Sequence, residues 1–258
     1  MAQNSINLDV VAAFYEDGSP LRDLIECRPD ADLELQHLSG RDQAEKDVFE
    51  LYLDSCTPHG ISKIVPRQWF STQDCLSALQ ELKADLILVY GTSIIKGEIV
   101  EKYRGRILNV HLGLSPYYRG SGTNYFPFVN NEPEFCGATF MYLDEGVDTG
   151  EIIHQIRPHI LATDSFHQLS NRFLIKVFRT YVAIAENFAQ LRSIEPVDWR
   201  RNETRKLYKK KDFTPASVEL LYGNFSSGMI KNYLDNYLER NRNAPIVENP
   251  IFDWSLAK

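Results

Sequence analysis

The sequence has no apolar run long enough to cross a membrane. Its longest uninterrupted apolar stretches, such as LILVYG (86–91), are much shorter than the ~20 residues that a transmembrane helix needs. The N-terminal residues MAQNSINLDVV also lack the basic flank and the small-residue cleavage site of a signal peptide. These features predict a cytoplasmic protein that has no membrane partner.

Cysteine is scarce and follows no spacing motif. The 258 residues include 4 cysteines and no CxxC pair, which disfavours a disulfide framework and a zinc site. Three histidines lie close together in the sequence, but their spacing matches no metal-ligand motif, so we predict no metal. The cysteines are Cys27, Cys56, Cys75 and Cys136, and the histidines are His154, His159 and His167.

An excess of positive charge is also missing. The formal net charge is −7, and the field of an acidic chain opposes nucleic acid binding. The one basic cluster is RRNETRKLYKKK (200–211). It is either a solvated connector or a patch for phosphate or a polyanionic substrate.

Up to about residue 160 the sequence instead alternates apolar and amphipathic segments. This alternation predicts right-handed βαβ units and an α/β fold, with a Rossmann-like, mostly parallel twisted sheet and flanking helices. The segment DLILVYG (85–91) is almost wholly apolar, as expected for a strand covered on both faces. Expected strands are 8–15, 33–38, 61–65, 85–91, 106–112, 137–144 and 151–160; expected helices are 20–27, 42–56, 71–83 and 97–103.

The later part of the chain has a different character. Residues 163–191 carry an apolar stripe at helical spacing and predict one long helix, capped by Thr163 or Asp164. Beyond about residue 195 come turn signals, the basic cluster and one or two short helices. We therefore expect a main domain of residues 1–192 and a small C-terminal extension of residues 193–258. The extension packs on the main domain or makes the subunit contact of a homodimer.

Two polar residues interrupt the end of an otherwise apolar strand, at Asn109 and His111. Side chains at i and i+2 share a face of a strand, and ligands bind beyond the carboxyl ends of strands in open α/β sheets. The loop DEGVDTG (144–150) can fold back over that edge and bring Asp148 to the imidazole. Such a trio suits acyl transfer to an amine: the histidine moves a proton, the aspartate orients it and the amide donates to an oxyanion. Singly, each residue has an ordinary structural explanation.

Together these motifs resemble the 10-formyltetrahydrofolate-dependent formyltransferases over roughly residues 8–190. That family has an Asn-x-His strand end, a Pro-x-Tyr-Arg-Gly type loop and an Asp-x-Gly-x-Asp-x-Gly type loop. Here they read NVHLGLSPYYRG (109–120) and DEGVDTG (144–150). The resemblance implies the formyltransferase fold for residues 1–192. It also makes Asn109, His111 and Asp148 the catalytic trio.

The resemblance implies 10-formyltetrahydrofolate as co-substrate, with two loops around its pterin. A pterin is flat and has donors and acceptors on its rim, so backbone groups at neighbouring strand ends can bind it. The cofactor-binding residues expected are Thr92, Ser93, Ile94 and Ile95 in one loop and Asp144, Glu145, Gly146 and Val147 in the other. The chain departs from the family's frequent HPSLLP at Leu112 and Gly113, and from a frequent histidine at Met141; these changes concern the acceptor side or the pterin packing.

The acceptor is expected to be a small molecule. The first βα turn, YEDGSPLRD, has a single glycine, which disfavours the purine-pathway acceptor. Only about 60 residues follow the long helix and the chain as a whole is acidic, which disfavours initiator tRNA. We favour a nucleotide-linked amino sugar, such as a 4-amino-4,6-dideoxy sugar of the O-antigen of lipopolysaccharide. Arg119 and the basic cluster could bind its phosphates. The expected substrate-binding residues are Tyr117, Arg119, Thr123 and Asn124, while Tyr117, Tyr118, Tyr125 and Phe126 either stack on the ligand or fill the core.

Other functions stay open. An N-hydroxyornithine formyltransferase of siderophore synthesis would use the same chemistry on another amine. A formyltetrahydrofolate hydrolase would use the same trio with water, although such proteins usually begin with a regulatory domain, whereas this chain begins at the first strand. A non-catalytic folate or sugar-nucleotide binding protein would have no need of the trio.

Overall fold

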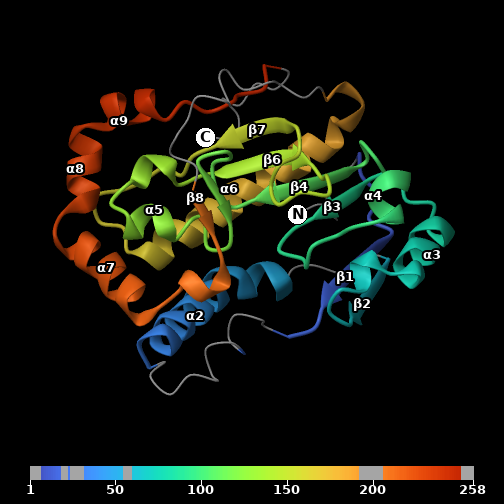
Figure 1. Ribbon diagram of the computed structural model, residues 1–258, viewed down its shortest axis with the longest axis horizontal. Helices are drawn as coiled ribbons and strands as arrows, with labels where there is room; N and C mark the ends of the chain where they lie inside the picture. The colour runs from blue at the N-terminus through green and yellow to red at the C-terminus, as the bar shows by residue number, and fades with distance from the viewer. Residues whose placement is uncertain (1–6, 19–22, 24–31, 55–59, 192–205, 251–258) are drawn as a thin grey trace.

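The computed structural model describes residues 7–18, 23, 32–54, 60–191 and 206–250 and contains three small sheets (Figure 1). The central sheet has the order β3-β4-β6-β7, and β1–β2 and β5–β8 form separate pairs. Three of these five pairings are parallel, and the two that include β6 are antiparallel. The predicted α/β class is confirmed. The strands are β1 (Ala12–Glu16), β2 (Ile61–Val65), β3 (Ile87–Val89), β4 (Ile107–His111), β5 (Tyr118–Gly120), β6 (Ala138–Tyr142), β7 (Ile152–Ile156) and β8 (Lys206–Tyr208).

The helices surround these sheets. They are α2 (Asp32–Asp54), α3 (Gln73–Glu81), α4 (Glu98–Lys102), α5 (Phe126–Val129), α6 (Phe166–Glu186), α7 (Pro215–Ser226), α8 (Met229–Asp235) and α9 (Tyr237–Asn243). Thr72 caps α3 by accepting a hydrogen bond from the amide of Cys75 at 3.4 Å. Within the described residues, no helix combines the length and the apolar character needed to cross a bilayer.

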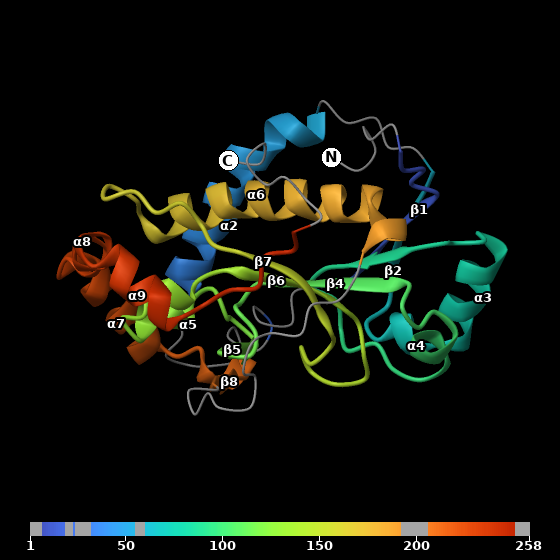
Figure 2. The same ribbon diagram turned by 90° about the horizontal axis from the view of Figure 1, so that it is seen from above.

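Helix α6 covers one face of the central sheet, and β5 and β8 lie on the other side (Figure 2). Leu108 and Val110 of β4 pack against Phe173 and Val177 of α6 in a shared apolar core. The hydroxyl of Tyr181 in α6 donates to the carbonyl oxygen of Leu108 at 2.5 Å and accepts from the amide of Val89 at 3.0 Å. One helix therefore fixes β3 against β4. Because odd and even positions of a strand face opposite ways, the remaining face of β4 is turned away from this core.

A second apolar core joins α2, α5, α7 and α8. It includes Leu38 of α2, Phe128 of α5, Val218 and Leu221 of α7 and Tyr233 of α8, all almost fully buried. The described part of the C-terminal segment thus packs on elements from the first half of the chain. The expected domain boundary at residues 192 and 193 lies outside the described residues.

Several expected elements differ from the structure. The expected strand 33–38 is the start of α2, the cap of α6 is Ser165 rather than Thr163 or Asp164, and His159 lies beyond β7. The strand within 85–91 is covered less than expected, since Leu88 is 39% exposed. The described C-terminal residues form three helices and a strand rather than one or two helices. The end of the expected helix 42–56, and the expected helix 20–27 apart from residue 23, fall on residues outside the description.

Candidate active site

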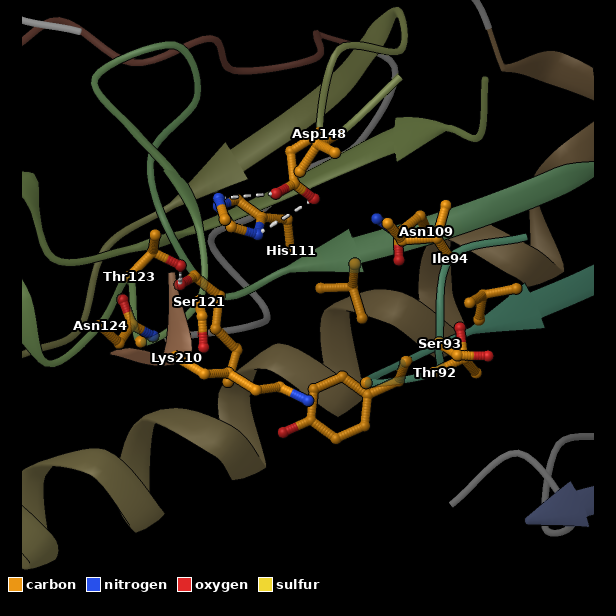
Figure 3. A pocket seen from close by; sticks show the side chains of 18 of the residues that line it. Thr92, Ser93, Ile94, Asn109, His111, Ser121, Thr123, Asn124, Asp148 and Lys210 are labelled. Atoms are coloured by element: carbon orange, nitrogen blue, oxygen red, sulfur yellow. Dashed lines mark hydrogen bonds and ion pairs between the residues drawn. The ribbon is translucent and has the colours of Figure 1, made fainter. Parts of the chain in front are cut away.

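Asn109 and His111 lie on the face of β4 that points away from α6. Figure 3 shows both side chains in one pocket, with Asp148 opposite His111. His111 is 6% exposed. The Asn109 amide makes no hydrogen bond within the part of the chain that the structure describes, so its donors and its acceptor are available to a ligand. The paired polar positions therefore form one wall of a site.

Asp148 reaches His111 from the loop that follows β6. Its Oδ1 lies 3.3 Å from Nδ1 of His111, and its Oδ2 accepts a hydrogen bond from the Gly120 amide at 3.0 Å. Asp148 has a φ of 52°, in the left-handed region that aspartate tolerates better than most residues. The loop thus places the Asp148 carboxylate between the imidazole of His111 and the backbone of β5. The structure brings together all three residues of the predicted trio.

The second ring nitrogen of His111 defines its tautomer. Nε2 lies 3.0 Å from the carbonyl oxygen of Tyr118, and since a carbonyl only accepts, Nε2 carries a proton. Burial lowers the pKa of His111, while the Asp148 carboxylate and the Tyr118 carbonyl act in the opposite direction. In the neutral ring, Nδ1 is then the basic atom. The carboxylate beside it stabilises the imidazolium that forms when Nδ1 takes up a proton.

Gly113 leaves room for this position of the imidazole. A Cβ atom at residue 113 would lie 2.6 Å from Nε2 of His111 and 2.7 Å from Cβ of Thr123. The Gly113 carbonyl accepts a hydrogen bond from Oγ1 of Thr139 at 2.6 Å, which fixes the backbone here. Residue 113, where the chain departs from the family motif, therefore lies directly beside the candidate base His111.

The trio opens onto a large cavity of about 1460 Å³. All four expected residues of the first cofactor loop, Thr92 to Ile95, line it, and so do Asp144, Gly146 and Val147 of the second loop. Glu145 does not line it. The amide and hydroxyl of Ser93 both donate to the carboxylate of Glu16, with 2.7 Å for the amide, so these two donors have a protein partner in this structure.

The expected substrate residues fall into two groups. Thr123 and Asn124 line the cavity, whereas Tyr117 and Arg119 do not. The Tyr117 hydroxyl donates to the carbonyl of Pro245 at 3.1 Å, and the buried Nε of Arg119 has no hydrogen-bond partner within the described residues. The aromatic residues Tyr117, Tyr118, Tyr125 and Phe126 are at most 7% exposed and belong to one apolar core, and Tyr125 and Phe126 also line the cavity.

Other cavity residues were missed or only partly anticipated. Lys210 extends into the pocket beside Ser121 (Figure 3), and its ammonium group makes no hydrogen bond or ion pair among the described residues. The basic cluster was its signal in the sequence. His37 and Arg41 of α2 also line the cavity and were not predicted, because His37 fell in the expected strand 33–38 and Arg41 between that strand and the expected helix 42–56. His, Cys, Asp and Glu side chains of the described residues form no group of three that could hold a metal ion.

Comparisons with known proteins identify the class. The profile of the formyl transferase family matches residues 40–184, more than half of the chain, so this protein belongs to that family of group-transferring enzymes. The fold is shared with a sugar N-formyltransferase from Shewanella sp FDAARGOS_354, at a TM-score of 0.51 and 14% identity over 83% of this chain and 87% of that one.

Proteins that are similar in sequence include two other kinds of formyltransferase. A methionyl-tRNA formyltransferase of Synechococcus sp. (strain JA-3-3Ab) is 33% identical over 161 residues, which are 60% of this chain and 48% of that protein. A chloroplastic phosphoribosylglycinamide formyltransferase of Arabidopsis thaliana is 24% identical over 156 residues, 58% of this chain and 52% of that protein. The chain thus spans about half the length of these curated relatives.

Proposed function

We propose that this protein is an N-formyltransferase that moves a formyl group from 10-formyltetrahydrofolate to a primary amine of a small molecule. The observation that carries the proposal is the His111–Asp148 pair, 3.3 Å apart, beside the Asn109 amide on the wall of a 1460 Å³ cavity. An acid–base group, its orienting carboxylate and an amide donor are what acyl transfer to an amine requires.

The cavity suits a reduced folate. The loops 92–95 and 144–147 offer backbone groups from two sides, and Ile94 and Val147 are 55% and 43% exposed, respectively. Apolar side chains that stay exposed at a cavity provide a wall for a flat ring, while backbone groups bind its polar rim. The bound folate would supply the activated formyl group. The Asp144 carboxylate accepts from the Gly146 amide at 3.0 Å and the Thr149 hydroxyl at 2.9 Å, which shapes the second loop.

The residues of this chain would then act as follows. The Asn109 amide donates to the formyl oxygen as negative charge develops on it, because the amide has no competing partner among the described residues. Nδ1 of His111 takes the proton that the attacking amine loses, and Asp148 stabilises the imidazolium. His111 returns this proton to the folate nitrogen that leaves. The hydrogen bond from Nε2 to the Tyr118 carbonyl keeps a proton on Nε2, so that only Nδ1 gains and loses a proton.

For the acceptor we propose a nucleotide-linked amino sugar. An anionic acceptor needs a cation in the cavity, and Lys210 is a lysine directed into it with no partner among the described residues. The hydroxyls and amides of Ser121, Thr123 and Asn124 lie on the same side and suit a sugar. The Oδ1 of Asn124 already accepts from the Gly137 amide at 3.0 Å, so this residue would offer its nitrogen. The site has no comparable role for Arg119.

An acceptor screen tests both levels of the proposal. Purified protein is mixed with 10-formyltetrahydrofolate and, separately, with amino-sugar nucleotides, N-hydroxyornithine, glycinamide ribonucleotide and methionyl-tRNA. Mass spectrometry follows the gain of one CO by the acceptor, and absorbance follows tetrahydrofolate. We expect transfer to an amino-sugar nucleotide and none by His111→Asn. Transfer to another acceptor alone overturns the sugar, and formate production without transfer to any amine overturns the transferase.

Lys210 gives the acceptor proposal its own test. Lys210→Met keeps the apolar stem and removes one charge-assisted contact, which typically contributes about 1.5–3 kcal/mol. The Michaelis constant for the sugar nucleotide should rise by about 10- to 100-fold, with turnover and the constant for folate nearly unchanged. Lys231→Met on α8, at an 80% exposed side chain, is the control and should change neither constant. An unchanged Michaelis constant in Lys210→Met would remove the lysine from the acceptor site.

We also propose that the C-terminal segment makes a homodimer contact. Leu220 of α7 and Leu238 of α9 are 56% and 77% exposed, and a second copy of the chain would cover them. Light scattering of the purified protein measures the mass directly, and a monomer at assay concentration would contradict the proposal.

A further inference from the structure

The catalytic pair takes its orientation from the backbone of one short strand. Strand β5 provides the Tyr118 carbonyl, which accepts from Nε2 of His111 at 3.0 Å. It also provides the Gly120 amide, which donates to Oδ2 of Asp148 at 3.0 Å. A displacement of β5 therefore moves the imidazole and the carboxylate together. Since β5 is only three residues long and lies apart from the central sheet, another element must hold it.

That element is β8, from the C-terminal segment. The two strands pair in parallel, with Tyr118 opposite Lys206 and Gly120 opposite Tyr208. The Lys206 amide donates to the Tyr117 carbonyl at 2.8 Å, and the Ser121 amide donates to the Tyr208 carbonyl at 2.9 Å. Gly120 has a φ of 91°, and a Cβ there would lie 2.1 Å from the Tyr208 carbonyl oxygen. Glycine at residue 120 is what permits the approach.

Side chains reinforce the backbone pairing. The Tyr208 ring stacks on Phe126, with centroids 3.7 Å apart and planes at 7°, and lies at 8° and 5.8 Å to Tyr118. Asn130 donates to the hydroxyls of Tyr208 and Tyr118 at 2.7 and 2.8 Å. Lys206 adds an ion pair to Glu132 at 2.6 Å and a hydrogen bond to the Tyr118 hydroxyl at 3.2 Å. The residues that hold β5 therefore come largely from β8.

We infer that β8 is a positioning element of the active site and that Tyr208 is its main positioning residue. The strand lies after the 40–184 region that the family profile matches. Because β8 nevertheless holds β5, the C-terminal segment is part of the catalytic machinery rather than an appendage. By holding Tyr118 and Gly120 in place, β8 fixes the tautomer of His111 and the carboxylate of Asp148. The same segment delivers Lys210, two residues later, to the cavity. This inference rests on the proposed function for its catalytic meaning.

The test compares Tyr208→Ala with Tyr208→Phe. The phenylalanine keeps the stack on Phe126 and Tyr118, and the alanine removes it. We expect Tyr208→Ala to lower kcat by about 10²-fold with a nearly unchanged Michaelis constant for folate, as a misplaced catalytic group does. Because the Tyr118 carbonyl raises the pKa of His111, its displacement should move the acid limb of the kcat–pH profile to lower pH. Tyr208→Phe should recover most of the rate and the wild-type limb.

A direct titration separates this inference from the proposed function. The imidazole signals of His111, assigned by their loss in His111→Asn, are followed by NMR against pH in each variant. A lower His111 pKa in Tyr208→Ala supports the positioning role even if no formyl transfer is found. Tyr237→Ala, at a 47% exposed ring of α9, is the matched control and should leave the titration unchanged.

Two outcomes would overturn the inference. One is a folded Tyr208→Ala with the wild-type kcat, pH profile and His111 titration. The other outcome matters if Tyr208→Ala does not fold. The His111 titration is then measured in Lys206→Met, which removes the ion pair to Glu132 and the hydrogen bond to the Tyr118 hydroxyl. It should shift the His111 titration in the same direction, and an unshifted titration counts against β8 as a positioning element.

Discussion

At the scale of single residues, the role of Asp148 follows from what it does to its neighbour. Its carboxylate favours the protonated ring and so raises the pKa of His111 against the effect of burial. Asp148→Asn keeps the shape but removes this charge, and the pKa of His111 should fall further. We expect kcat to drop by about 10²- to 10⁴-fold, as for loss of acid–base assistance, and the acid limb of the kcat–pH profile to move to lower pH. An unchanged limb with an unchanged rate would make Asp148 only a turn residue.

Gly113 offers a second residue-scale prediction. A methyl group at residue 113 would press on Nε2 of His111 at 2.6 Å and on the side chain of Thr123. The imidazole would have to leave the Tyr118 carbonyl, so Gly113→Ala should lower kcat by about 10-fold or more while the protein stays folded. Gly223→Ala in α7 is the control, since nothing lies within 4 Å of its Cβ position.

The control variant Gly223→Ala should change the stability of the protein in a known direction. Alanine in a helix loses less backbone entropy than glycine, so Gly223→Ala should raise the free energy of unfolding by about 0.5–1 kcal/mol and leave kcat alone. Wild-type turnover in Gly113→Ala would show that the ring does not need the space at residue 113.

At the scale of elements, short-range patterns in the sequence predicted most of the strands and the helices α3, α4 and α6. The prediction was wrong at 33–38, where Leu33 and Leu35 alternate with polar residues as in a strand. In the structure His37 and Leu38 of this segment are buried, and α2 packs against α6 and α7. Contacts with segments more than a hundred residues away decide the outcome there, and no local pattern reports them.

The loop between β4 and β5 depends on one buried hydroxyl. Oγ1 of Thr139 in β6 donates to the Gly113 carbonyl at 2.6 Å and accepts from the Ser115 amide and from Gln155 Nε2, both at 3.0 Å. Thr139→Val has nearly the same shape but removes this partner from the Gly113 carbonyl and the Ser115 amide in a fully buried place, while Gln155 Nε2 keeps its hydrogen bond to the Ser115 carbonyl at 2.7 Å. The free energy of unfolding should fall by about 1–3 kcal/mol, measured by urea denaturation.

An exposed threonine provides the comparison for this element. Thr149→Val removes a hydroxyl that donates to Asp144 at 2.9 Å in an exposed loop, where water can replace it. Its unfolding free energy should stay within about 0.5 kcal/mol of the wild type. Equal effects at both positions would mean that burial does not make the Thr139 network important.

At the scale of the whole molecule, the site is assembled from segments far apart in the sequence. The trio was predictable because Asn109 and His111 share a strand and the Asp148 loop follows the neighbouring strand. The contributions of β8 and α2 were not, since they depend on how the ends of the chain pack around the sheet. Arg119 was expected in the cavity on the basis of its distance from His111 in the sequence alone, and it does not line the cavity in the structure.

Buried histidines make the folded state sensitive to acid. Burial lowers the pKa of His37 to about 3, helped by His167 and Arg41, and lowers that of His154 to about 3, helped by Lys176. Both rings are neutral in the folded and unfolded states above pH 6.5, so this stability is complete there. Below pH 6.5 only the unfolded chain takes up these protons, and stability is lost as pH falls toward 3.

The expected loss can be measured through His37. At pH 5 each histidine should cost about 2 kcal/mol of unfolding free energy relative to pH 8. His37→Phe cannot titrate and keeps a ring among Tyr125, Phe166 and Phe213, so its loss between pH 8 and pH 5 should be smaller by about that amount. His159→Gln, at an exposed side chain, should keep the full loss. Urea denaturation at the two pH values gives each difference, and equal losses in wild type and His37→Phe would contradict a neutral buried His37.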